Sequence, residues 1–190
     1  MNRSLFPALV PGLMLMLQAA PLHAQDHAMP MHPMHMPMEG APAACPATAP
    51  ALPPELAGWR DRTAIAAAAD GQGVAAAMLV PGKGADVALR PTPDVAYPVR
   101  PAHPGGSVSH GGLLGFTVSQ PGTYRVALGS AAWIDLARDG QAVASTAHGP
   151  GPACSGVRKM VDFALTSGRY LIEIAGNGAP QLSVLVTRLP

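Results

Sequence analysis

The sequence predicts an all-β protein: one antiparallel β-sandwich, jelly-roll-like, preceded by a disordered N-terminal arm. Three observations lead to this prediction. From residue 63 onward, short runs rich in Val, Ile, Leu, Tyr and Thr alternate with turn signals about every ten residues, which is typical of sandwiches and barrels. The 21 Gly and 22 Pro among 190 residues disfavour a helical bundle, because both residues interrupt helices. The length allows one domain with a modest core.

The first expected element, residues 1–24, has the layout of a secretory signal peptide. Arg3 supplies one positive charge, and residues 5–20 carry none. The apolar centre Leu13–Leu17 is followed by small residues up to Ala24. The apolar run is short and broken by proline, which disfavours the alternative of a retained membrane anchor. We therefore expect cleavage after residue 24, a periplasmic or secreted protein, and no membrane span in the mature chain.

The second expected element, residues 25–54, is a His/Met/Pro-rich arm and linker. Five Met and two His occur within the eleven residues 28–38, and proline at every third or fourth position disfavours helix and strand alike. Thioether and imidazole groups together are a ligand set for copper, since Met favours Cu(I) and His accepts either oxidation state. The alternative is a low-complexity linker whose His and Met are incidental. The expected copper ligands are Met29, Met31, His32, Met34, His35, Met36 and Met38.

A second copper motif depends on the position of cleavage. After removal of residues 1–24 the chain would begin Gln25-Asp26-His27. A free amine, two amide nitrogens and a third-position imidazole form a square-planar site that suits Cu(II) or Ni(II). The arrangement resembles the amino-terminal copper- and nickel-binding motif of other secreted proteins. Cleavage one residue away, or cyclisation of Gln25, would remove the site.

The chain has two cysteines, Cys45 and Cys154. An even cysteine count in an exported protein predicts a disulfide. This bond would tie the arm to the folded part and close a loop of about 110 residues. The alternative is a Cys/His metal site, although neither cysteine has a partner at ligand spacing.

The folded domain is expected over residues 55–190. Tyr124, Val126 and Leu128 lie on one face of a strand by alternation. The Ala-rich stretch 64–69 would also suit a helix, but the following Asp70-Gly71-Gln72-Gly73 favours a hairpin turn. The expected strands are 63–69, 74–80, 85–90, 95–99, 113–118, 123–129, 132–138, 141–147, 158–165, 169–175 and 181–188.

Three segments within residues 113–188 resemble the bacterial pre-peptidase C-terminal domain. They begin at Phe116, Trp133 and Phe163, and two Gly-x-Tyr strand starts flank an Asp-Gly hairpin. That family is a small secreted jelly-roll-like sandwich that binds surfaces or polymers, or assists a neighbouring enzyme, without being catalytic. The resemblance implies a binding or accessory module.

Longer segments within residues 45–190 resemble a group of small exported proteobacterial proteins that often carry the name homogentisate 1,2-dioxygenase. The segments are Cys45-Pro46, Leu52–Trp59, Pro104–Gly112, Gly122–Ser130 and Gly149–Phe163. This resemblance implies an alternative function, an iron-dependent ring-cleaving dioxygenase whose iron is held by two His and one carboxylate.

Within the domain, such an iron site would use His110 and His148, with Glu173, Asp135 or Asp162 as the carboxylate. Both histidines flank Gly-rich bends, where backbone can approach a ligand closely. No His-x-His pair places two ligands on one face of a strand. The alternative role of both histidines is loop hydrogen bonding.

Charge and motifs exclude several other function classes. The 12 Lys+Arg and 11 Asp+Glu leave a formal net charge of only +1, which is too small for the electrostatic attraction that non-specific nucleic-acid binding requires. No nucleotide loop, nucleophile elbow or kinase pattern occurs. The basic pair Arg158-Lys159 would bind a carboxylate or phosphate, or form a solvated strand edge. Both tryptophans are expected in the core, Trp133 more deeply than Trp59.

We therefore predict a periplasmic or secreted binding or accessory protein whose arm captures copper, and no catalytic residue is assigned. Its expected partners are a metal ion and an unknown protein or surface. The two alternatives are the iron-dependent dioxygenase and a surface module that binds protein or polysaccharide and carries an inert arm.

Overall fold

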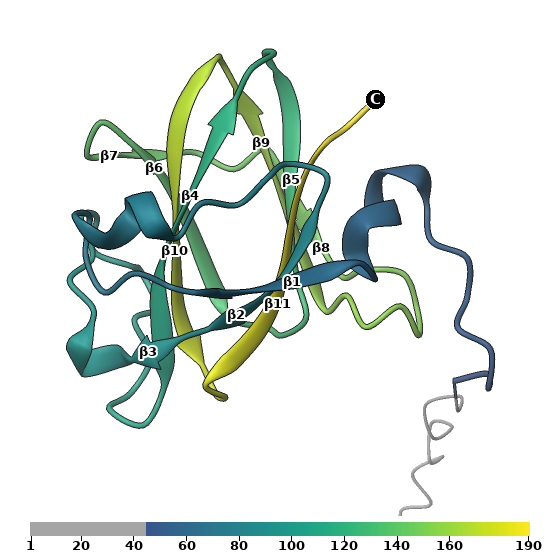
Figure 1. The fold of residues 1–190 in the computed structure, drawn as a ribbon, viewed down its shortest axis with the longest axis horizontal. Helices are drawn as coiled ribbons and strands as arrows, with labels where there is room; N and C mark the ends of the chain where they lie inside the picture. The colour runs from purple at the N-terminus through teal and green to yellow at the C-terminus, as the bar shows by residue number, and fades with distance from the viewer. Residues whose placement is uncertain (1–44) are drawn as a thin grey trace, which may run out of the picture. The chain divides into compact units, whose positions relative to one another are not determined.

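Two β-sheets packed face to face make up the part of the chain that the structure describes, residues 45–190 (Figure 1). The structure is a computed structural model, and the expected leader and the copper ligands of the arm lie outside the described residues. The six-stranded sheet has the order β1 (Arg62–Ala66), β2 (Gly84–Ala88), β11 (Gln181–Arg188), β5 (Gly122–Leu128), β9 (Lys159–Leu165) and β8 (Ala147–Gly149). The five-stranded sheet has the order β3 (Arg90–Pro91), β4 (His110–Val118), β10 (Gly168–Asn177), β6 (Trp133–Arg138) and β7 (Gln141–Val143).

The predicted antiparallel sandwich is confirmed. All strand pairs run antiparallel except β1 and β2, which are parallel. Strands β4, β6 and β10 belong to the five-stranded sheet, whereas β5, β9 and β11 belong to the six-stranded one. The chain therefore passes repeatedly from one sheet to the other, which is the jelly-roll-like arrangement expected from the sequence.

The two Gly-x-Tyr motifs start β5 and β10 in the same way. The glycine that opens each motif has a positive φ angle, which residues with a side chain rarely adopt. The Tyr124 hydroxyl donates to the carbonyl oxygen of Gln120 at 2.9 Å, and the Tyr170 hydroxyl donates to that of Thr166 at 3.0 Å. Each hydroxyl thus fixes the turn four residues upstream of its own ring.

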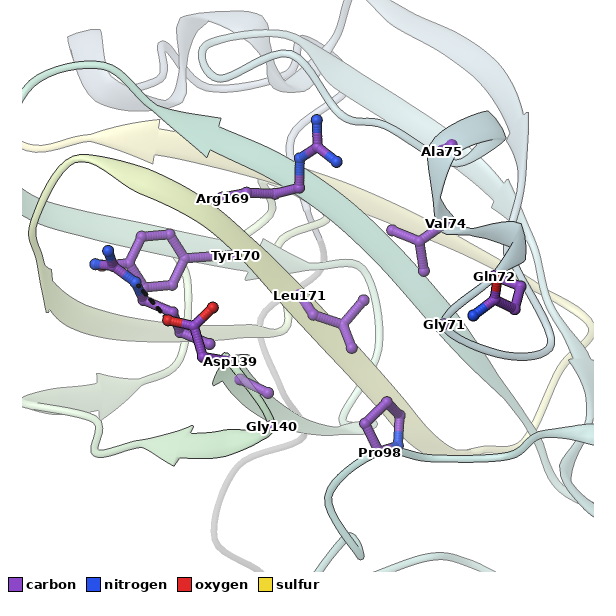
Figure 2. A pocket seen from close by; sticks show the side chains of 12 residues that line it. Gly71, Gln72, Val74, Ala75, Pro98, Asp139, Gly140, Arg169, Tyr170 and Leu171 are labelled. Atoms are coloured by element: carbon purple, nitrogen blue, oxygen red, sulfur yellow. Dashed lines mark hydrogen bonds and ion pairs between the residues drawn. The ribbon is translucent and has the colours of Figure 1, made fainter.

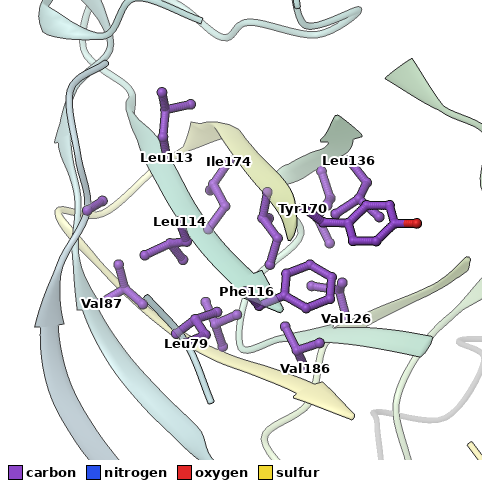
Figure 3. Close-up of a cluster of buried hydrophobic side chains, with 14 of the residues drawn as sticks. Leu79, Val87, Leu113, Leu114, Phe116, Val126, Leu136, Tyr170, Ile174 and Val186 are labelled. Carbon is purple, nitrogen blue, oxygen red and sulfur yellow. The ribbon is translucent and has the colours of Figure 1, made fainter. Parts of the chain in front are cut away.

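Aromatic rings from three strands join the two sheets inside the core, and Figure 3 shows two of them, Phe116 and Tyr170. The Phe116 ring on β4 lies 5.7 Å from the ring of Tyr170 and 6.4 Å from the ring of Tyr124. Phe116 is fully buried, and the two tyrosines are almost fully buried. Because aromatic side chains bury large apolar areas, these three residues carry much of the hydrophobic stabilisation at this end of the sandwich.

The strand expected at residues 74–80 is wrong. Asp70 Oδ1 accepts two backbone N–H groups, at 2.9 and 3.0 Å, and a short 3-10 helix, η2 (Gly73–Ala76), follows. Met78 alone keeps strand pairing, as an isolated bridge to β4. The Asp side chain satisfies local N–H groups, so the chain turns here instead of joining a ladder.

Two further expected strands differ in the structure. Residues 95–99 follow a one-turn 3-10 helix, η3 (Thr92–Asp94), and cross the outer face of the five-stranded sheet without joining it. Pro98 has no N–H, and the N–H groups of Ala96 and Val99 donate to the Ala69 carbonyl oxygen and to the Glu173 carboxylate instead of to a neighbouring strand. The expected strand 141–147 is divided, because β7 pairs with β6 whereas β8 pairs with β9 in the other sheet.

A second, smaller hydrophobic cluster covers the outer face of the six-stranded sheet. The 3-10 helix η1 (Pro54–Trp59) packs Leu56 and Trp59 against Ala127 and Leu185 of that sheet. The indole Nε1 of Trp59 donates to the carbonyl oxygen of Ser155 at 3.1 Å. Trp59 is 3% exposed, whereas Trp133 is half-buried, so the expected order of burial for the two tryptophans is wrong.

The predicted disulfide between Cys45 and Cys154 is confirmed, with a Cα–Cα distance of 5.5 Å. It joins the first described residue to the loop between β8 and β9. None of the helices in residues 45–190 combines the length and the apolar character that a membrane crossing needs.

Candidate functional site

The structure does not bring His110, His148 and Glu173 together. His110 opens β4 opposite Asn177, and Glu173 lies in the middle of β10 opposite Leu113. His148 is exposed on β8, which belongs to the other sheet. Across residues 45–190, no three His, Cys, Asp or Glu side chains are placed so that they could hold one metal ion. The iron site considered from the sequence therefore has no ligand group in the described domain.

The two other carboxylates considered for that site already have structural partners. Asp162 on β9 accepts hydrogen bonds from Arg125 Nε at 2.7 Å and Arg125 Nη2 at 2.8 Å. Asp135 on β6 accepts a hydrogen bond from Trp133 Nε1 at 2.8 Å. Asp162 therefore belongs to a buried ion pair, while Asp135 still borders a cavity.

Glu173 is a fully buried acid on the outer face of the five-stranded sheet, beneath residues 95–99. Its Oε1 accepts the backbone N–H of Val99 at 2.9 Å, whereas its Oε2 has no hydrogen-bond partner in the described structure. Burial raises the pKa of Glu173, the Val99 N–H opposes this effect, and the charge of Asp135 adds to it. The carboxyl is closed off from solvent, and Glu173 lines none of the cavities described below.

Tyr97 lies in the same segment, residues 95–99, and attaches it to β10. Its hydroxyl donates to the carbonyl oxygen of Ile174 at 2.8 Å. Burial and the neighbouring Glu173 raise the pKa of Tyr97 to about 12, against a smaller lowering effect of the Gly112 backbone. Residues 95–99 are therefore tied to the sheet by one side-chain donor and one backbone donor.

A cavity of about 360 Å³ lies over the other half of the same outer face (Figure 2). Leu171 of β10, Val74 of η2 and Pro98 give it an apolar lining, and the exposed Arg169 stands at its margin. Arg138, the second cation here, is already engaged by the hydroxyl of Tyr170 at 3.0 Å and by the carboxylate of its sequence neighbour at 3.5 Å. Of its two cations, Arg138 is therefore already paired and Arg169 is exposed to solvent.

A second cavity, of about 470 Å³, opens at the edge of the sandwich where β6 and β7 face β8 and β9. Its walls are largely apolar and include Val143, Val161 and Phe163. Its polar lining residues include Lys159, Asp135, His148 and Ser145. An apolar cavity of this volume with a few polar groups is typical of a small-molecule site.

Trp133 and Lys159 form the wall of this cavity. Lys159 Nζ lies 5.0 Å from the centre of the Trp133 ring and donates to the carbonyl oxygen of Ala132 at 2.9 Å. The His103 ring meets the Trp133 ring edge-on, with 4.3 Å between the ring centres. Trp133, Lys159 and His103 also line a neighbouring cavity of about 650 Å³. We name the four residues Trp133, Lys159, Asp135 and His148 the Trp–Lys cleft.

Burial governs the electrostatics of the Trp–Lys cleft. Desolvation lowers the pKa of Lys159, and the nearby charge of Asp135 opposes that effect. No carboxylate lies within 4.0 Å of Lys159 in the described part of the chain. The cleft therefore holds a partly desolvated ammonium whose charge lacks a contacting counterion.

Sequence reasoning singled out Lys159 only as half of a basic pair and Trp133 only as a core residue. The structure separates the pair, since Arg158 is exposed and Lys159 turns into the cleft. One signal was available in the sequence: residues 133 and 135 share a face of a strand, so Trp133 and Asp135 are within reach of each other. Nothing in the spacing of the chain predicts that Lys159 joins them.

The chain was compared with models of known protein families and with curated protein sequences. No family model matches it, and no curated sequence matches it.

Proposed function

We propose that the protein is an exported, periplasmic or secreted binding module that captures copper through residues 25–38. The observation that carries the proposal is the clustering of five Met and two His within eleven residues, next to the Gln25-Asp26-His27 amino terminus that cleavage after residue 24 would expose. Thioethers and imidazoles bind Cu(I), and the amino-terminal motif binds Cu(II). The captured ion would be exchanged as cargo, and no bond chemistry on a substrate is required.

The fold of residues 45–190 is consistent with a scaffold role. The Cys45–Cys154 disulfide fixes the chain to the domain directly after the copper-binding segment. Such bonds persist in oxidising compartments, which agrees with export. The His, Cys, Asp and Glu side chains of the described domain form no group of metal ligands, so the arm is the better candidate for metal binding.

The experiment is a metal analysis and copper titration of the protein that begins at Gln25, purified without a His tag, beside a variant that lacks residues 25–44. Cu(I) is titrated against a chromogenic chelator, and Cu(II) is followed by its visible absorption. A second variant tests the thioethers while keeping the side chains apolar, by changing five methionines to Leu: Met29, Met31, Met34, Met36 and Met38. His27→Ala tests the amino-terminal motif separately.

We expect the deletion to abolish copper binding, the Met→Leu variant to lose Cu(I) while retaining Cu(II), and His27→Ala to show the reverse. Stoichiometric iron in both the full and the shortened chain would overturn the proposal in favour of a metalloenzyme. Absence of copper binding in the full chain would also overturn it, and would leave the function of a surface-binding module.

A further inference from the structure

We propose that the Trp–Lys cleft is a binding site for a small organic monocarboxylate with an apolar body. The carboxylate would pair with the Lys159 ammonium, and the apolar body would fill the cavity between β7 and β9. This inference concerns the domain alone and does not depend on copper binding by the arm.

The Lys159 ammonium has no contacting carboxylate in the described domain. Three cationic side chains of the described domain are half-buried: Arg125, Arg138 and Lys159. Arg125 contacts two carboxylates and Arg138 contacts one, whereas Lys159 has none within 4.0 Å. A partly desolvated ammonium without a counterion is unfavourable, so an anion that enters the cleft gains a charge-assisted hydrogen bond.

Lys159 keeps hydrogen-bond donors that a ligand can use. The ammonium group has three N–H donors. One donates to the carbonyl oxygen of Ala132, and the cation lies over the face of Trp133. These contacts leave donor capacity toward the cavity that Lys159 lines.

The wall of the Trp–Lys cleft is held in place before a ligand arrives. Trp133 Nε1 donates a hydrogen bond to the Asp135 carboxylate at 2.8 Å. The Lys159 ammonium lies over the Trp133 ring, and the His103 ring packs edge-on with it. A site whose groups are already oriented loses less conformational entropy on binding. The Trp–Lys cleft therefore offers a fixed aromatic surface beside a fixed cation.

The other residues that line the cavity determine which class of anion fits it. Val143, Val161 and Phe163 provide an apolar wall that a hydrated inorganic ion would leave unused. The Asp135 carboxylate borders the same cavity and repels a second negative charge. A monocarboxylate with an apolar body pairs with the Lys159 ammonium, packs against the apolar wall and has no second charge for Asp135 to repel. A phosphate monoester carries that second charge.

The test is a titration of the protein that begins at Gln25 with phenylacetate and octanoate, followed by the indole N–H signal of Trp133 in ¹H–¹⁵N spectra. Phenylacetamide is the uncharged comparison, and phenyl phosphate is the doubly charged one. The indole signal is assigned with Trp133→Phe.

We expect saturable binding of the carboxylates, and at least about tenfold weaker binding of phenylacetamide and phenyl phosphate. Lys159→Met keeps the apolar stem and should weaken carboxylate binding by about tenfold or more, whereas Lys159→Arg should restore most of it. Lys83→Met, at an exposed site away from the cleft, is the matched control and should change nothing. Val143→Trp should block the cavity while the protein stays folded by near-UV circular dichroism.

Equal binding of phenylacetate and phenylacetamide to the unmodified protein would overturn the proposal, and this comparison requires no variant to fold. Tighter binding of phenyl phosphate would overturn the assignment to carboxylates. Equal effects of Lys159→Met and Lys83→Met would also overturn the proposal. The same titration with the variant that lacks residues 25–44 should give unchanged affinity, which separates this site from the copper proposal.

Discussion

Arg125 and Asp162 form a two-point ion pair across β5 and β9. Arg125 Nε donates to Oδ1 at 2.7 Å and Arg125 Nη2 donates to Oδ2 at 2.8 Å. The Asp162 residue is 8% exposed, and Glu55 of η1 lies 3.6 Å from the same guanidinium. The hydrogen bond with Asp162 raises the pKa of Arg125 more than burial lowers it. Through its additional contact with Glu55, Arg125 therefore joins the six-stranded sheet to the segment that covers it.

We predict that Asp162→Ala lowers the free energy of unfolding by about 3 kcal/mol, because it leaves a half-buried guanidinium without its main partner. Asp86→Ala is the matched control, since Asp86 pairs with Arg62 but has a side chain that is 54% exposed. The control should cost about 1 kcal/mol or less. Urea unfolding of both variants measures the difference, and equal losses would show that burial of the pair has no influence.

The two motif tyrosines provide a second matched pair. Tyr170→Phe should destabilise the protein more than Tyr124→Phe, by about 2 against about 1 kcal/mol. Both hydroxyls bond to a carbonyl four residues upstream, but that of Tyr170 also accepts from Arg138 Nη1 at 3.0 Å and from the Thr166 N–H at 3.1 Å. Thermal and urea unfolding of the two variants provide the measurement. A larger loss for Tyr124→Phe would contradict this account of the motif.

Apolar–polar alternation and turn-forming residue pairs predict most strands of the sandwich, because both depend on residues that are close together in the sequence. They fail where a local side chain or a proline decides the outcome, as at Asp70 before η2 (Gly73–Ala76) and at residues 95–99. The apolar alternation of residues 95–99 is real, since Tyr97 packs against the core. That segment covers the sheet instead of extending it, and alternation does not distinguish the two arrangements.

The candidate site was less predictable, because its contacts join residues that are distant in sequence. Trp59 is buried through a bond to Ser155, 96 residues away, so its charged sequence neighbours are a misleading guide to its exposure. The contact of Lys159 with Trp133 crosses from one sheet to the other. Sequence spacing on one strand places Asp135 near Trp133, but only the packing of the sheets adds the cation.

The buried acid Glu173 predicts a pH dependence of stability. Burial raises its pKa above the ordinary 4.5, so the folded state keeps the proton to higher pH than the unfolded chain. The contribution to the free energy of unfolding is fully present below about pH 4.5, and it is lost as pH rises through the raised folded-state pKa. Glu173→Gln removes the titration while keeping the shape of the side chain.

We therefore expect the stability of the unmodified protein, relative to Glu173→Gln, to fall as pH rises from about 4 to about 8. Urea unfolding of both proteins across this range gives the difference at each pH. The sign distinguishes this case from a salt-bridged acid, whose contribution would grow over the same range. A flat or rising difference would mean that the Val99 N–H outweighs burial in setting the pKa of Glu173.

The disulfide should account for a large share of the stability of the domain. Its 109-residue separation implies a loss of about 4 to 5 kcal/mol when both cysteines are replaced, in the chain-entropy account of cross-links. Cys154 also has a φ angle of 58°, in the left-handed region that disfavours residues with a side chain. Breaking the bond and relieving this backbone strain are separable effects.

Cys45→Ser combined with Cys154→Ser removes the bond and keeps a side chain at the left-handed position. Cys45→Ser combined with Cys154→Gly removes the bond and the strain, so it should be about 1 kcal/mol more stable than the first variant. Thermal unfolding with and without reductant checks both expectations, since reductant should lower the midpoint of the unmodified protein only. If both variants matched the oxidised protein in stability, the anchoring of Cys45 to the β8–β9 loop would serve the position of the preceding arm and not the stability of the sandwich.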